Sequence, residues 1–132
     1  MGEDGRAHLA KNATEEGVKV TPSGLQYRVL ETGNGERVPT PDQTCEVSYV
    51  SRLVNGVVVR GVQFIEVTPV EEVDGMEEAL MSMREGDRWE LSIPAEMAFG
   101  KQGMGHIPPN AVLIVDLQLH EVLRGKGSFI LR

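Results

Sequence analysis

Residues 75–122 decide the fold, and they read GMEEALMSMREGDRWELSIPAEMAFGKQGMGHIPPNAVLIVDLQLHEV. The start of this stretch predicts a short helix that Gly86 ends, because apolar residues recur at helical spacing and acidic residues lie at its beginning. Residues 88–93 and 112–122 alternate apolar and polar side chains, which is typical of half-buried strands. The apolar positions of the helix are Val73, Met76, Leu80 and Met83.

The chain before this helix is predicted to form strands. Residues 25–30 and 44–53 both alternate in polarity. The pair Asn55-Gly56 indicates a tight hairpin, which continues in residues 57–59. Residues 63–68 are predicted to form a further strand. The fold class is therefore α+β, with an antiparallel sheet wrapped on a single helix.

Length and composition exclude several classes of protein. A chain of 132 residues holds one domain with one core. The net charge of −7 argues against nucleic-acid binding through phosphate neutralisation. No apolar run approaches the ~20 residues that cross a bilayer, and no signal peptide is recognisable, so we expect a cytoplasmic protein, with a nuclear location as the alternative.

Both ends of the chain differ from its middle. Residues 1–16 are polar and are expected to form a flexible or short helical arm. Residues 17–122 are expected to form the domain. Residues 123–132 carry three basic residues and no acidic one, and they are expected to form a basic tail.

Simple nucleophilic and metal chemistry is not indicated. Cys45 falls within a predicted strand and has no histidine near it in sequence, so we expect a buried thiol rather than a nucleophile. His8, His106 and His120 show no metal-ligand spacing, and His120 is expected to be solvated on the outer face of the last strand. We therefore expect no metal and no cofactor.

The order of elements resembles the FKBP-type peptidyl-prolyl cis-trans isomerases, the macrolide-binding immunophilins. The resemblance is carried by the helix, the strand ending in Ile93-Pro94, the turn Ala98-Phe99-Gly100, the run Ile107-Pro108-Pro109-Asn110-Ala111 and the final strand. Residues 17–18 and 22–27 resemble the lead-in of the macrophage-infectivity-potentiator subgroup. The implied fold is a five- to six-stranded antiparallel half-barrel wrapped around one short helix.

The resemblance also implies an activity and partners. The implied activity is isomerisation of X-Pro bonds in proline-containing polypeptides, without cofactor, nucleic acid or membrane. A macrolide is an implied weak ligand. The long dimerising helix of the infectivity-potentiator subgroup is not in this sequence, so a monomer is expected.

Ten residues fall at pocket positions of the family when its pattern is carried over one position at a time, and some of them keep the family's residue type. Tyr49 matches the pocket tyrosine, and Phe99 falls where the family usually has a tyrosine; these two are the catalytic candidates. For the aromatic residue on the strand after Arg60, the shortened loop leaves Gln63 and Phe64 as alternatives. The substrate-binding candidates are Val59, Arg60, Phe64, Val73, Met76, Trp89, Ile107 and Val115; Trp89 is expected to serve core packing first.

Several of these positions depart from the family's pattern. Met76 falls where most members have a tryptophan, Val59-Arg60 falls where they have Phe-Asp, and Val115 replaces another aromatic residue. Phe99 lacks the usual hydroxyl, a hydrogen bond worth roughly 0.5–1.5 kcal/mol. These changes imply attenuated activity. The alternative hypothesis is a non-catalytic protein-interaction module on the same fold.

Overall fold

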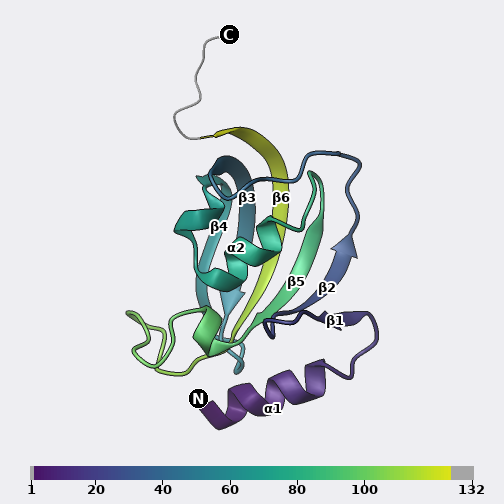
Figure 1. Cartoon of the computed structure of the whole chain (residues 1–132). Helices are drawn as coiled ribbons and strands as arrows, with labels where there is room; N and C mark the ends of the chain where they lie inside the picture. Colours follow the sequence, from purple (N-terminus) through teal and green to yellow (C-terminus); the bar gives the residue numbers. More distant parts are fainter. Residues whose placement is uncertain (1, 126–132) are drawn as a thin grey trace.

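The computed structural model describes residues 2–125, which form six strands, two α-helices and two short 3₁₀ helices. All paired strands are antiparallel, and the sheet order is β1-β2-β5-β6-β3-β4. This confirms the α+β prediction, with six strands (Figure 1). The elements are α1 Gly2–Asn12, β1 Val18–Val20, β2 Gln26–Glu31, β3 Gln43–Arg52, β4 Val58–Val67, η1 Pro69–Glu71, α2 Asp74–Leu80, β5 Arg88–Ile93, η2 Ala95–Met97 and β6 Leu113–Gly125.

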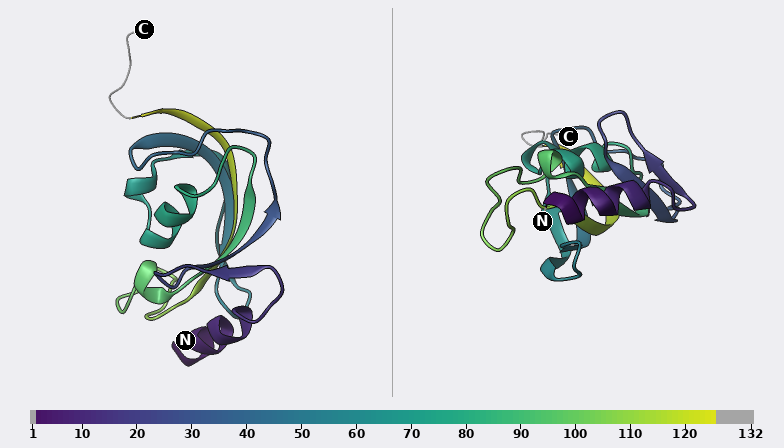
Figure 2. Two further views of the ribbon diagram at one scale, coloured as in Figure 1. Left: turned by 45° about the vertical axis from the view of Figure 1, so that its right-hand side comes forward. Right: turned by 90° about the horizontal axis from the view of Figure 1, so that it is seen from below.

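The sheet curves around α2, which lies in its concave face (Figure 2). Alternate residues of the central strands point towards the helix and are buried, as their sequence pattern predicts. The helix contributes apolar residues to the same core. Fully buried side chains of this core include Val47, Leu80, Met83, Leu91, Ile93, Leu117 and Leu119.

Gly75 sets the distance between α2 and the sheet. A Cβ at this position would overlap Ile93 Cγ2 and lie 3.1 Å from Ile93 Cγ1. Both residues are fully buried, so neither can move towards solvent without disturbing the core. The first turn of α2 therefore packs directly on β5 because residue 75 has no side chain.

Some element boundaries differ from the sequence-based expectation. Residues 57–59 and 63–68 were predicted as separate strands, but β4 is continuous through residue 67. The pairing of β4 with β3 contains two register shifts, which keep the two strands paired along this length. The short strand β1 was not predicted, and it pairs with β2 at the edge of the sheet.

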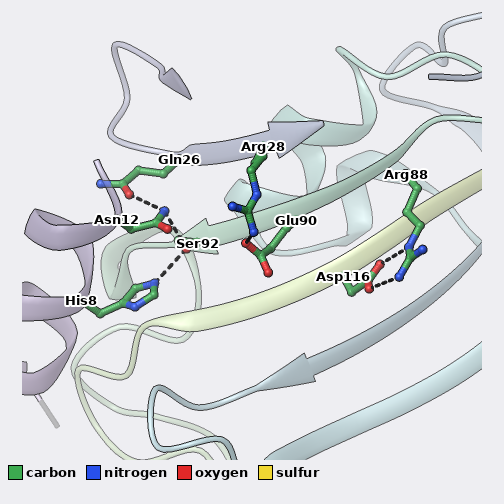
Figure 3. Close-up of polar contacts among 8 residues, drawn as sticks. All are labelled: His8, Asn12, Gln26, Arg28, Arg88, Glu90, Ser92 and Asp116. Atoms are coloured by element: carbon green, nitrogen blue, oxygen red, sulfur yellow. Dashed lines mark hydrogen bonds and ion pairs between the residues drawn. The ribbon is translucent and has the colours of Figure 1, made fainter. Parts of the chain in front are cut away.

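The N-terminal helix α1 lies across one end of the sheet (Figures 1 and 2). Gly5 makes the close approach possible, since a Cβ there would lie 2.6 Å from Val112 Cγ2. Polar contacts fix the other turns. The Nε2 atom of His8 lies 3.0 Å from Ser92 Oγ, and Asn12 Nδ2 donates to Gln26 Oε1 at 2.8 Å (Figure 3).

The outer face of the sheet carries ion pairs between neighbouring strands. Arg88 on β5 binds Asp116 on β6 through two hydrogen bonds of 2.9 and 2.7 Å (Figure 3). Arg28 on β2 pairs with Glu90 on β5 at 3.0 Å. These side chains are partly exposed, so the pairs add register specificity more than free energy.

The two ends of the chain, which were expected to form an arm and a tail, both contain regular structure. Residues 1–16, expected as a flexible or short helical arm, contain α1. The predicted basic tail begins within β6, and residues 126–132 lie outside the described part of the chain. None of the helices within residues 2–125 has the length and apolar character needed to cross a membrane.

Replacing Gly75 tests the packing of α2. We expect Gly75→Ala to lower the free energy of unfolding by about 1–3 kcal/mol, because the added methyl group overpacks the contact with Ile93. Urea unfolding followed by circular dichroism measures the change. The matched control is Gly61→Ala on β4, whose Cβ would have no neighbour closer than 4.0 Å. Equal stability of both variants would contradict the close approach.

Protonation of His8 should weaken the docking of α1. Burial lowers the pKa of His8 below its ordinary 6.5, and Glu90 partly opposes this. The folded chain therefore holds the imidazole proton less tightly than the unfolded chain, so stability falls as the pH drops below about 6.5. The measurement is the loss of unfolding free energy between pH 7.5 and 5.5. His8→Gln should show a smaller loss than the wild type, and an equal loss would refute the assignment.

Candidate functional site

An apolar cavity opens between α2 and the concave face of the sheet. Its volume is about 480 Å³, including the open mouth. Strands β3 to β6, the start of α2 and the loop after β5 all contribute to its walls. The lining residues are Tyr49, Ser51, Val59, Arg60, Glu72, Val73, Met76, Ile93, Phe99, Ile107, Leu113 and Val115.

Eight of the ten predicted site residues line this one cavity. They come from five places in the chain, which meet at this cavity only in the folded structure. The eight are Tyr49, Val59, Arg60, Val73, Met76, Phe99, Ile107 and Val115. Ser51, Glu72, Ile93 and Leu113 also line the cavity and were not predicted as site residues. The outward-inward alternation of β3 could have indicated Ser51, which follows Tyr49 by two residues.

The floor of the cavity is formed by well-packed apolar side chains. Val115 and Met76 are buried, with exposed fractions of 2% and 5%. Ile93 and Leu113 close the base from β5 and β6, where they are paired across the strands. The floor can therefore hold a small apolar group, and its side chains offer such a group no hydrogen bond.

Trp89 lies outside the cavity. Its ring stacks on Tyr27 of β2, with centroids 4.2 Å apart and planes 12° apart. Trp89 precedes Ile93 by four residues on β5, so it faces the same side of the sheet but lies further from the cavity's end of the strand. Trp89 is buried, with 6% exposed, and its contacts are packing contacts outside the cavity lining.

Phe64 also lies outside the cavity, because a bulge turns it towards the outer face. Its φ of 53° lies in the left-handed region, and the residue is 62% exposed. The Phe64 N–H donates to Ser48 Oγ at 3.0 Å, while its ring stacks on His120 with centroids 4.3 Å apart. The alternative residue Gln63 does not line the cavity either. Neither of the two aligned positions therefore supplies a wall aromatic.

His120 is held by this same arrangement. It lies on the outer face, as expected, but its ring is covered by Phe64 and its Nε2 atom lies 2.7 Å from Ser48 Oγ. The sequence signal for this contact is weak, because it depends on the register shift between Val47 and Tyr49 in the β3–β4 ladder.

Three ionisable side chains line the cavity, namely Tyr49, Arg60 and Glu72. Burial raises the pKa of Glu72, and the Arg60 guanidinium opposes that shift. Burial also raises the pKa of the Tyr49 phenol, and Arg60 again opposes it. The Cζ atom of Arg60 lies 6.0 Å from the centre of the Tyr49 ring. Arg60 is therefore the positive charge that both groups sense.

The described residues offer no obvious site for a metal ion. No group of three or more His, Cys, Asp or Glu side chains within residues 2–125 gathers closely enough to hold one. Cys45, which was weighed as a nucleophile, is fully buried within β3 and lies outside the cavity. The arrangement is suited to binding an apolar group and provides no acid–base pair beside a nucleophile.

Comparison with known proteins identifies the family. The family model described as FKBP-type peptidyl-prolyl cis-trans isomerase matches residues 35–120, and the model of the domain amino terminal to it matches residues 1–29. The chain belongs to the FKBP-type peptidyl-prolyl cis-trans isomerase family.

Particular relatives agree with the predicted subgroup. The chain is 38% identical over 129 residues to the FKBP-type 22 kDa peptidyl-prolyl cis-trans isomerase of Escherichia coli, covering 93% of this chain and 62% of that protein. It is 39% identical over 127 residues to the macrophage infectivity potentiator of Trypanosoma cruzi, covering 92% and 64%. The chain thus spans less than two-thirds of the length of both relatives.

A solved structure has the same fold. The peptidyl-prolyl cis-trans isomerase of Pseudomonas syringae superposes with a TM-score of 0.87 at 29% identity, covering 93% of each chain. The half-barrel predicted from the order of motifs is therefore confirmed as the fold of this chain.

The burial of Cys45 predicts its reactivity. Desolvation raises the pKa of the thiol to about 11, so the thiolate is scarce at neutral pH. We expect an aromatic disulfide reagent to leave native protein unlabelled at pH 8 and to label it rapidly in denaturing urea. Stoichiometric labelling of native protein within seconds would show that β3 opens readily or that the thiol is exposed.

Proposed function

We propose that this chain is a peptidyl-prolyl cis-trans isomerase that acts on X-Pro bonds in polypeptides. The observation that carries the proposal is the apolar cavity, in which Tyr49, Phe99 and Ile107 converge from separate elements. Membership of the family and the names of the relatives support it over the alternative of a non-catalytic interaction module.

The chemistry requires no covalent step. Rotation about an X-Pro bond has a barrier of ~18–20 kcal/mol, because amide resonance must be lost. A cavity lowers that barrier when it binds the twisted amide better than either planar form. In the twisted amide the charge separation is reduced, so apolar surroundings favour it over the planar ground state. The proline ring would occupy the floor formed by Met76, Ile93 and Val115.

Side chains and backbone at the mouth would orient the substrate. Val73 immediately precedes α2, and within the described residues no group accepts a hydrogen bond from its N–H. This donor would hold a substrate carbonyl next to the ring. Phe99 and Ile107 would cover the ring from the loop after β5, and Tyr49 would flank it from β3.

The finer attributes remain predictions. The altered walls at Met76 and Val59 would give weaker macrolide binding and a lower rate than a cavity with aromatic walls. A cytoplasmic location and a monomeric state are expected from the sequence. The polypeptides on which the chain acts are proposed only as proline-containing.

A charge placed inside the cavity should strongly reduce catalysis. The test is Val59→Asp, because Val59 lines the cavity and a carboxylate there would face the apolar ring. The matched control is Val58→Asp on the adjacent residue, which is 56% exposed and outside the lining. Protease-free NMR exchange on an Ala-Leu-Pro-Phe peptide gives the rates.

We expect wild-type protein at micromolar concentration to accelerate the exchange, and Val58→Asp to behave similarly. Val59→Asp should reduce kcat/KM at least about tenfold, equivalent to about 1.4 kcal/mol. A wild-type rate equal to background would refute the isomerase function. Equal losses in the two variants would mean that the cavity is not the site.

A further inference from the structure

Arg60 is an exposed cation in the lining of a largely apolar cavity. It lies on β4 opposite Ser51, lines the cavity and reaches over the Tyr49 ring. Within residues 2–125, Arg60 forms no ion pair, because no carboxylate oxygen lies within 4.0 Å of its guanidinium nitrogens. It hydrogen-bonds the Tyr49 side chain, and the remaining N–H donors of its guanidinium are left for an incoming group.

The proline ring itself cannot use this guanidinium. Arginine carries five N–H donors and no acceptor, and its planar fork matches a carboxylate. The ring would lie on the apolar floor, whereas Arg60 is an exposed residue of the cavity lining. The residue next to the proline is the one whose side chain can reach it.

Glu72 on the facing wall opposes this attraction without cancelling it. Glu72 lies beyond ion-pair distance of Arg60 and is half-buried, whereas the guanidinium is exposed. A carboxylate bound on the exposed side of Arg60 is in direct contact with the cation and further from Glu72. Coulomb attraction falls with distance and solvent screens the longer contact, so the attraction dominates.

We propose that Arg60 is a specificity-determining residue that makes the site prefer prolines preceded by an acidic residue. The proposal rests on the proposed isomerase function and specifies its substrate class. Because Arg60 is exposed, its pairing with a substrate carboxylate is a rim contact. It should change the preference between substrates by a modest factor rather than decide whether catalysis occurs.

The test compares peptides that differ in one side chain. Acetyl-Ala-X-Pro-Phe-amide, with X as Glu, Gln, Lys or Leu, carries no terminal charge, and Glu and Gln have nearly the same shape. For wild-type protein at low salt we expect kcat/KM for Glu to exceed that for Gln roughly two- to fivefold. Lys should be slower than Gln. The Glu:Gln ratio should approach one in about 0.5 M salt, where screening is strong.

Variants assign the preference to Arg60. Arg60→Met should bring the Glu:Gln ratio to about one, and Arg60→Glu should invert it. Glu72→Gln should raise it, because the opposing charge is removed. Arg52→Met is the matched control: it removes one positive charge from β3 outside the cavity, so the ratio should remain that of the wild type.

The outcomes separate this proposal from the isomerase function. Acceleration of the Leu peptide with equal Glu and Gln rates, or with Lys preferred, would overturn the role of Arg60 and leave the isomerase intact. A ratio that persists in Arg60→Met would do the same. No acceleration of any peptide would refute the isomerase function itself. NMR titration of the wild type with the Glu and Gln peptides would then test the binding preference alone.

Discussion

The close contact between Gly75 and Ile93 is the constraint on which the rest of the molecule depends. Because residue 75 has no side chain, the first turn of α2 rests directly on β5. Val73 and Met76, at the start of this helix, line the same cavity as Leu113 and Val115 of β6. The cavity is therefore a consequence of packing: it occupies the space beyond the start of the helix, where the sheet continues and the helix does not.

The cavity combines a rigid floor with a charged rim. Its base consists of core side chains whose positions are fixed by the strand ladder, so the site needs little reorganisation to receive an apolar group. Arg60 and Glu72 do not belong to this packed base, because Arg60 lies on the edge strand β4 and Glu72 lies in the segment before α2. Substitutions at the rim therefore change the charge that meets a bound group and leave the floor and the fold unchanged.

The sequence predicted most of the fold and most of the cavity lining for an identifiable reason. The alternation in β3, β5 and β6 assigns inward faces directly, and the order of motifs between Gly75 and Val122 identifies the half-barrel. Phe64 could not be placed in this way. The face to which the Phe64 side chain points depends on an extra residue in β4 where it pairs with β3. Alternation along β4 alone does not reveal the register of that pairing. The sequence also could not show that Trp89 lies outside the cavity, because alternation along β5 does not indicate where the cavity ends.

The bulge at Phe64 also bears on how the molecule behaves at high concentration. Strand β4 is an edge of the sheet and is ten residues long, which is enough to template a strand of another molecule. The left-handed turn at Phe64 interrupts its row of outward N–H and C=O groups, and Arg60 and Glu66 place charges on either side of the interruption. The other edge, β1, has only three residues. Both edges of the open sheet therefore have features that hinder pairing with a strand of another molecule.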